Sequence, residues 1–158
     1  MSLIPIALER FVADLVRRPE RWRHAIRHAS DVRVYEQIWN DEQVNAWVIC
    51  WSEDQDTGYH DHDESGAAIA VISGQVREDR LRLGGPPRSQ TFGPGEIFTV
   101  PAVAIHRVLH AGDAPAVTLH AYSPPLVRTG AYRIGAEGEL QRELLSNEEE
   151  LRVTAAVG

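Results

Sequence analysis

Short apolar runs separated by glycine and proline fill the middle of the chain and constrain its fold more than any other feature. Between residues 32 and 122 these runs read VRVYEQIW, NAWVICW, AAIAVISG, QVREDRLRL, IFTVP, HRVLHA and AVTLHAY. The segments GGPP, FGPGE and AGDAP interrupt them, so that turns recur at intervals of about a dozen residues. Strands of this length with no helices between them are typical of an antiparallel sandwich or barrel and not of βαβ units.

Helical periodicity is confined to the N-terminal end of the chain. The apolar residues that recur there at helical spacing are Leu8, Phe11, Val12, Leu15 and Val16. Pro19 ends this helix, and residues 20–28 predict a second short one. At the other end, GAYRIGAEGELQRE predicts a hairpin, and the acidic residues 147–150 predict a frayed helix.

The length of 158 residues suits one ordinary domain. We therefore expect a single all-β domain over residues 1–158. Its N-terminal helical segment would cover residues 1–30, the β-barrel residues 31–125, and a C-terminal extension residues 126–158.

Charge and hydropathy narrow the possible partners and location. The net charge of −7 argues against nucleic acid or an anionic membrane as a main partner. No segment approaches the roughly 20 apolar residues that span a bilayer, and the N-terminus lacks the uninterrupted apolar core of a signal peptide. The one cysteine, Cys50, excludes an intrachain disulfide. These features predict a cytoplasmic protein, which we expect to be a monomer or a weak homodimer.

A pair of histidines opens the segment GYHDHDESGAAIAVISG, residues 58–74. In a strand, residues i and i+2 point to the same face, so His60 and His62 would both reach one ion while Asp61 points away. The alternative is a polar strand end that happens to carry two imidazoles.

A third histidine, His106, stands in GEIFTVPAVAIHRVLH, where it follows Gly95 and Pro101. This arrangement resembles the second motif of the cupin superfamily, and the pair of histidines followed by a strand and a glycine resembles the first. The resemblance implies a cupin fold, which is a double-stranded β-helix or jelly-roll barrel, and a metal held by the three histidines. The alternative, a barrel that has lost its metal, is disfavoured because all three histidines are present.

Many cupins add a glutamate ligand in the first motif, at the position where this chain has Ala67. Glu64 lies too early in the sequence to replace it. We therefore expect three neutral ligands, which leave the full charge of a divalent ion available to an anionic substrate. Zinc also accepts three histidines and water, so the ligands alone do not choose the metal.

A second polar constellation lies in VTLHAYSPPL, where Thr118, His120 and Tyr122 alternate along one predicted strand and share a face. If that face points into the barrel, a hydroxyl, an imidazole and a phenol line up beside the metal. The alternative is a chance polar alternation on the solvent face. Together with the three histidines, these residues resemble the thiol dioxygenases, and most closely the cysteine dioxygenase family.

The resemblance runs from NAWVICW through HAYSPP and so covers most of the predicted barrel. It implies one Fe(II) per chain on the three histidines. It also implies a hydrogen-bonded relay formed by Thr118, His120 and Tyr122, in which threonine takes the place of the family's serine. The family's Ser-Pro step, which resembles a cis-proline turn in relatives, maps onto Ser123 and Pro124.

Two departures from the family pattern bear on the substrate site. Mammalian members cross-link the active-site tyrosine to a cysteine that stands where this chain has Ala67. Because Cys50 lies on an earlier predicted strand, Tyr122 is expected to be a free phenol.

Mammalian members also hold the substrate carboxylate with an arginine two residues after a tyrosine. Here Gln37 stands two residues after Tyr35, which resembles the glutamine-type bacterial members, some of which prefer 3-mercaptopropionate. A shift of the alignment across a shorter loop would make Arg33 the candidate instead. Arg128 and Arg133 are further candidates for a carboxylate clamp.

The sequence therefore predicts a mononuclear ferrous dioxygenase that uses O₂ to convert L-cysteine to its sulfinic acid. Its binding partners would be a small thiol and O₂. One alternative is the same chemistry on 3-mercaptopropionate or another small thiol-carboxylate. A second alternative, of a different class, is a cupin that binds a small molecule without turnover.

Overall fold

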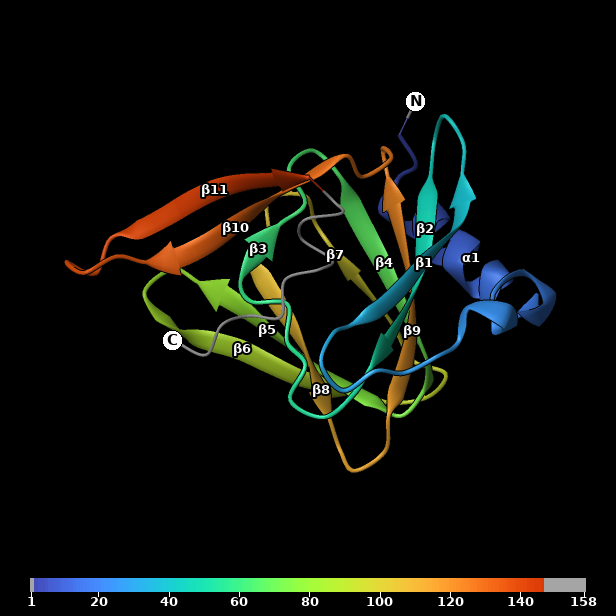
Figure 1. Cartoon of the computed structure of the whole chain (residues 1–158). Helices are drawn as coiled ribbons and strands as arrows, with labels where there is room; N and C mark the ends of the chain where they lie inside the picture. The colour runs from blue at the N-terminus through green and yellow to red at the C-terminus, as the bar shows by residue number, and fades with distance from the viewer. Residues whose placement is uncertain (1, 147–158) are drawn as a thin grey trace.

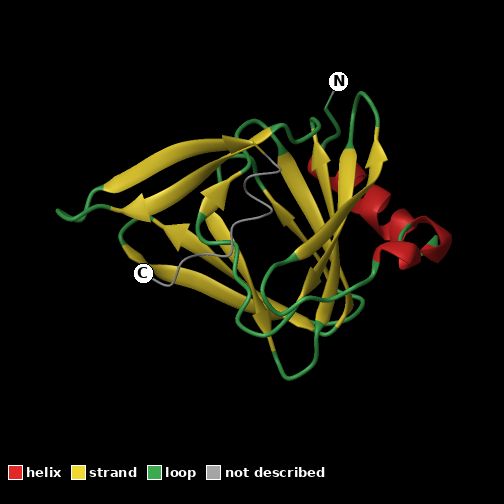
Figure 2. Cartoon of the chain, in the orientation of Figure 1, coloured by secondary structure: helices red, strands yellow, loops and turns green. Residues whose placement is uncertain are grey.

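The computed structural model describes residues 2–146, and every structural statement below concerns that part of the chain. Two antiparallel sheets curve around a common interior and form a barrel (Figures 1 and 2). The first sheet contains, in spatial order, β1 (Val34–Asn40), β2 (Asn45–Trp51), β9 (Ala116–Ser123), β4 (Gly66–Ser73) and β7 (Ile97–Val100). The second contains β11 (Leu140–Ser146), β10 (Arg128–Ile134), β3 (His60–Asp61), β8 (His106–Ala111), β5 (Gln75–Arg82) and β6 (Gly85–Phe92).

The predicted antiparallel barrel is thus confirmed. Strands far apart in the sequence become neighbours in both sheets, because β2 pairs with β9 and β3 pairs with β8 and β10. These long-range pairings bring the two histidine-bearing segments of the sequence together.

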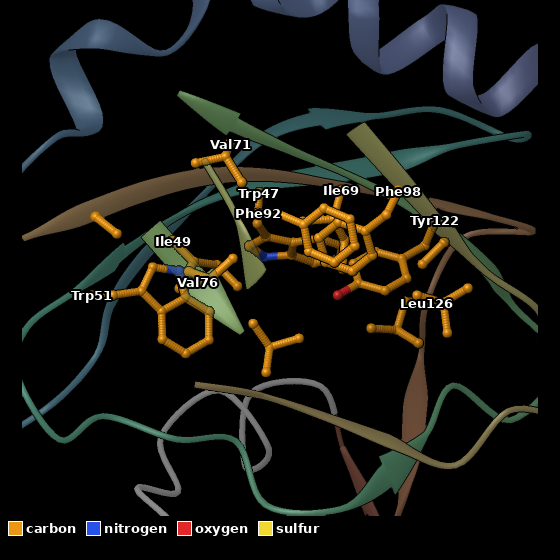
Figure 3. Packing of buried hydrophobic residues seen from close by; sticks show 14 residues of the cluster. Trp47, Ile49, Trp51, Ile69, Val71, Val76, Phe92, Phe98, Tyr122 and Leu126 are labelled. Atoms are coloured by element: carbon orange, nitrogen blue, oxygen red, sulfur yellow. The ribbon is translucent and has the colours of Figure 1, made fainter. Parts of the chain in front are cut away.

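Strands β2, β4 and β9 are buried on both faces, which explains their nearly continuous apolar sequences. Along β2, Trp47, Ile49 and Trp51 point into the barrel, where Figure 3 shows them among the core residues, with Trp51 at the opposite end of the cluster from Tyr122. The alternating residues Val48 and Cys50 point outward, toward the helix.

Helix α1 (Pro5–Val16) covers the outer face of the first sheet with Leu8, Val12 and Leu15. The prediction of a second helix over residues 20–28 is wrong, because the chain forms two single 3₁₀ turns, η1 (Pro19–Arg21) and η2 (Arg23–Ala25). A helix this short gains too few hydrogen bonds to offset the cost of its first turn. The intervening Trp22 also has an extended φ of −135° and donates its indole N–H to the Leu15 carbonyl at 2.9 Å.

The segment GGPP, which predicted a turn, lies mostly in strand β6, which begins at Gly85. Its prolines are accommodated because β6 is the edge of its sheet and its pairing with β5 is irregular between Arg80 and Arg82. The turn itself lies one step earlier, at Gly84, where a φ of +71° favours glycine.

The predicted C-terminal hairpin is confirmed as β10 and β11, and β10 also pairs with β3, so this part of the extension continues the second sheet. The expected frayed helix at residues 147–150 lies outside the described residues. The Ser123–Pro124 peptide bond is cis, as the resemblance implied. In residues 2–146, no helix has both the length and the apolar character needed to cross a bilayer.

Candidate metal centre

Strand pairing gathers the three predicted metal ligands inside the barrel. His60 lies directly opposite His106 in the pairing of β3 with β8, and His62 follows immediately after β3. The Nε2 atom of His62 lies 3.2 Å from that of His60 and 3.3 Å from that of His106. One nitrogen from each ring falls within 4.8 Å of the others, and all three residues are buried.

Hydrogen bonds behind two of the rings determine which nitrogens carry protons. The Nδ1–H group of His60 donates to the Gly58 carbonyl at 3.0 Å, and that of His106 donates to the Glu78 carboxylate at 2.8 Å. A neutral imidazole protonated on Nδ1 presents a bare lone pair at Nε2. The Nε2 lone pairs of His60 and His106 therefore point toward the same small region of the barrel.

This donor set fits a divalent cation. Burial, together with the neighbouring histidines, lowers the pKa of His62 and of His106 well below the usual value, so protonation does not relieve the crowding of lone pairs. Neutral imidazole nitrogens bind Fe(II), Zn(II) and other first-row ions, and the arrangement alone does not select among them.

Glu78 is a part of the centre that sequence reasoning missed. It lies on β5, is buried, and accepts two hydrogen bonds from Nη2 of Arg80 at 2.9 and 3.0 Å. Burial raises the pKa of Glu78, and the Arg80 guanidinium opposes that shift. A signal was present in the sequence, because Glu78 shares a strand face with the apolar Val76, which lies in the core.

The residues of the predicted relay lie in line on the inner face of β9. Thr118 Oγ1 is 2.8 Å from His120 Nε2, and His120 Nδ1 is 3.2 Å from the Tyr122 hydroxyl. Trp51, which the sequence analysis did not include in the relay, donates its indole N–H to Thr118 Oγ1 at 2.9 Å. Burial lowers the pKa of His120 to about 3, and the positive charge of Arg33 acts in the same direction.

His120 and Tyr122 of the relay line one cavity together with the three histidines. The Tyr122 ring packs edge-on against the His62 ring at a centroid distance of 5.0 Å. Arg33, the arginine favoured by a shifted alignment, also lines this cavity and places its guanidinium over the Trp51 ring at 5.5 Å. Apolar side chains complete the lining, among them Ile49, Ile69 and Val108.

The other predicted substrate-binding residues lie elsewhere. Tyr35 is partly buried against the interior cluster, and Gln37 is exposed on β1. Arg128 is exposed and pairs with Asp63 at 2.8 Å, while Arg133 pairs with Glu143 at 2.8 Å on the outer part of the hairpin. The structure therefore brings none of these four residues into the lining of the cavity.

The surroundings of Tyr122 show why a cross-link is absent. Ala67 on β4 lies directly opposite Tyr122 on β9, so a cysteine at position 67 would stand beside the phenol. The chain's cysteine, Cys50, points toward α1 on the other side of the sheet.

Comparison with known proteins assigns the chain to a family. The family model for cysteine dioxygenase type I matches residues 11–134, a range that contains every ligand and relay residue described above. The chain belongs to the cysteine dioxygenase type I family.

Among curated members of this family, cysteine dioxygenase type 1 of Danio rerio is 31% identical over 93 residues, which are 52% of this chain and 46% of that protein. The Homo sapiens protein is 26% identical over 92 residues, again 52% of this chain and 46% of that protein. The chain thus spans about half the length of the curated relatives it matches.

Solved structures share the fold. A Thermus thermophilus protein superposes with a TM-score of 0.58 at 18% identity, covering 65% of this chain and 93% of that one. A cupin superfamily protein from Desulfitobacterium hafniense gives a TM-score of 0.54 at 12% identity, covering 65% and 87%. The predicted cupin fold is thereby confirmed, and at these identities the likeness concerns the fold alone.

Replacing Glu78 with glutamine should weaken metal binding by about 10- to 100-fold, because the Nδ1–H group of His106 loses its charged acceptor. Calorimetric titration of the metal-free protein with Fe(II) under anaerobic conditions measures this change. Glu137→Gln, which alters an exposed carboxylate, is the matched control and should bind as the wild type does. Equal affinities for the two variants would contradict a role for Glu78 in orienting His106.

Proposed function

We propose that this chain is a mononuclear non-haem iron thiol dioxygenase that oxidises L-cysteine to cysteine sulfinic acid with O₂. One observation supports the proposal most directly: a member of the cysteine dioxygenase type I family lines one buried cavity with three histidines and with His120 and Tyr122, and Thr118 is hydrogen-bonded to His120. In the proposed reaction both oxygen atoms of O₂ are transferred to sulfur, and sulfur supplies the electrons that O₂ gains. No further reductant is needed.

Residues His60, His62 and His106 would hold Fe(II), which when bound supplies the one-electron chemistry that activates O₂. Because imidazole ligands are neutral, they would leave the charge of a bound divalent ion uncompensated, and that charge would favour the thiolate over the thiol. The buried position of the three rings also excludes bulk water from the reacting sulfur.

The hydrogen bonds of the relay have a direction. An indole N–H only donates, so Thr118 Oγ1 must accept from Trp51. In the part of the chain that the structure describes, the remaining partner of the buried Thr118 hydroxyl is Nε2 of His120, so its proton is satisfied by donation to that nitrogen. Neutral His120 then carries its own proton on Nδ1 and donates it to the Tyr122 oxygen.

This direction turns the phenolic proton of Tyr122 away from His120 and toward the cavity. The phenol would therefore act as a hydrogen-bond donor to the substrate or to oxygen beside sulfur, and it would deliver a proton there when negative charge develops. The relay holds the ring in place without a covalent cross-link.

Arg33 is proposed to bind the substrate carboxylate. It brings a permanent positive charge into the cavity lining, and a planar guanidinium binds a carboxylate in two-point fashion. The described lining contains no acidic side chain that would pair with an ammonium group. This observation supports 3-mercaptopropionate, which lacks the amine of cysteine, as a second candidate substrate.

Oxygen consumption by the iron-loaded protein tests the proposal with three thiols: L-cysteine, 3-mercaptopropionate and cysteamine, which has no carboxylate. We expect the highest kcat/KM with L-cysteine, a sulfinic acid product by mass spectrometry, and little uptake with cysteamine. A higher kcat/KM with 3-mercaptopropionate would transfer the assignment to that substrate. Thiol binding without oxygen uptake would indicate a binding protein and overturn the enzyme assignment.

Tyr122→Phe should lower kcat by about 10²-fold or more and leave iron content unchanged, because it removes one hydroxyl from an otherwise identical ring. Thr118→Val should lower kcat in the same way, since it removes the hydroxyl that sets the direction of the relay. Thr118→Ser keeps that hydroxyl and should retain most of the activity. If the valine and serine variants had equal rates, the proposed direction of the relay would be wrong.

Arg33→Gln should raise KM for thiols that carry a carboxylate by about 10- to 100-fold, since a charged hydrogen-bonded pair is lost. The weak turnover of cysteamine should not fall. Steady-state kinetics with Arg133→Gln provide the control, because Arg133 pairs with Glu143 outside the cavity. A rise in KM for the Arg133 variant alone would place the carboxylate on the hairpin instead.

A further inference from the structure

His62 differs from the other two histidines in what holds its ring. The Nδ1 atoms of His60 and His106 are hydrogen-bonded to Gly58 and Glu78, whereas Nδ1 of His62 is buried with no hydrogen-bond partner among the described residues. His62 lies just beyond β3, a strand of two residues that pairs with β8 at a single position, and its backbone carbonyl accepts one hydrogen bond, from the Ser65 N–H at 2.9 Å. Beyond this bond and the edge-on packing of its ring against Tyr122, a contact of the segment that carries His62 would fix its position.

Asp61, which separates His60 from His62, supplies that contact on the side away from the cavity. Its carboxylate accepts two hydrogen bonds from the Arg142 guanidinium, both at 2.9 Å, and one from the Tyr132 hydroxyl at 2.5 Å. It also accepts the backbone N–H of Asp63 at 2.9 Å. Asp61 is 8% exposed while Arg142 is exposed, so the ion pair is buried on the side of the carboxylate only, and its two hydrogen bonds define its geometry.

A second acidic residue holds the other side of His62. Asp63 has a left-handed φ of 56°, and its carboxylate pairs with Arg128 at 2.8 Å and with Arg142 at 3.5 Å. Asp61 and Asp63, the acidic residues on either side of His62, are therefore both bound to side chains of β10 and β11. In Figure 1 this hairpin extends from the barrel next to β3.

Gly130 makes the central ion pair possible. It lies opposite Asp61 in the pairing of β10 with β3. The Arg142 side chain crosses directly over it, and a Cβ atom at position 130 would collide with Nε and Cζ of Arg142. A side chain at position 130 would force the guanidinium to shift from the place where it reaches Asp61.

We propose that Asp61 and Arg142 form a latch between the β10–β11 hairpin and residues 60–63, and that this latch positions His62 for the metal. The inference rests on the metal centre of the proposed function. Arg142 lies beyond residues 11–134, the range that the family model matches, so the latch adds to what membership of the family implies.

Positioning and simple electrostatics predict effects of opposite sign. Removing the positive charge of Arg142 leaves the negative charge of Asp61 uncompensated near the metal, so Coulomb attraction alone would tighten cation binding. Loss of the latch would instead let His62 move and would weaken binding. Gly130→Ala makes the cleaner test, because it displaces the Arg142 guanidinium without changing the charge of the protein.

The experiment is calorimetric titration of metal-free protein with Co(II) and, anaerobically, with Fe(II). Gly130→Ala and Arg142→Met should each weaken binding by about 10- to 100-fold. The visible Co(II) spectrum should shift as one histidine ligand is lost, and the melting temperature of the metal-free protein reports whether each variant is folded. Arg133→Met, which removes an exposed arginine from the same hairpin, should bind as the wild type does.

Wild-type affinity or tighter binding in Gly130→Ala would overturn the latch. If Arg142→Met does not fold, Arg142→Lys replaces it, since lysine keeps the charge but loses the two-point contact and should also weaken binding. A wild-type protein that binds neither Co(II) nor Fe(II) would refute the metal centre itself. If instead the wild type binds metal and every variant binds it equally tightly, only the latch is refuted.

Discussion

Three imidazole rings converge in the interior of this barrel, and the pairing that brings two of them together is a single residue pair between β3 and β8. The convergence is unfavourable in the absence of a cation, because ring nitrogens crowd together where burial has removed water and lowers the pKa of His62 and His106. The surrounding structure must therefore supply the stability that the ligands do not. It does so from three directions, through the Gly58 carbonyl, the Glu78 carboxylate and the charged network around Asp61.

The two faces of the first sheet have different roles, because one lines the site and the other packs against α1. On its inner side, Trp47 packs edge-on against Tyr122 at a centroid distance of 5.7 Å, so the same residues that line the site also belong to the core. On its outer side, small and branched residues pack against α1. Close-packed protein interiors transmit small changes in side-chain volume. Substitutions in the core of the barrel are therefore expected to move the relay as well.

Much of the site follows from one periodicity. A repeat of two predicted that His60 and His62, and likewise Thr118, His120 and Tyr122, share a side of the chain. In the structure His60, His62, His120 and Tyr122 line the cavity, although His62 lies just beyond β3, and Thr118 is hydrogen-bonded to His120. The glycine and proline punctuation likewise predicted the barrel. The sequence pattern gave the wrong secondary structure where tertiary context determines it. This happened in the 3₁₀ turns after α1 and in the proline-containing edge strand β6.

The strand pattern puts Glu78 on a buried face, but neither its contact with His106 nor the places of Trp51 and Arg142 follow from local pattern. Each reaches the site from a different strand, and the register that aligns those strands depends on packing between segments far apart in the sequence. Arg33 was considered only as an alternative, because a short loop leaves the alignment at β1 open. The structure places Arg33 in the cavity lining. The direction of a side chain at the start of β1 depends on the barrel as a whole and is not given by the local sequence.

The location of Cys50 has a consequence for a protein that we propose to oxidise thiols. Its side chain lies on the helix-facing side of β2, while the cavity occupies the barrel side of the same sheet. Burial also raises the pKa of the Cys50 thiol and keeps it in its less reactive protonated form. Within residues 2–146, the first sheet therefore separates the chain's cysteine from the cavity. Under the proposed function, this placement would keep the Cys50 thiol away from the site of oxidation.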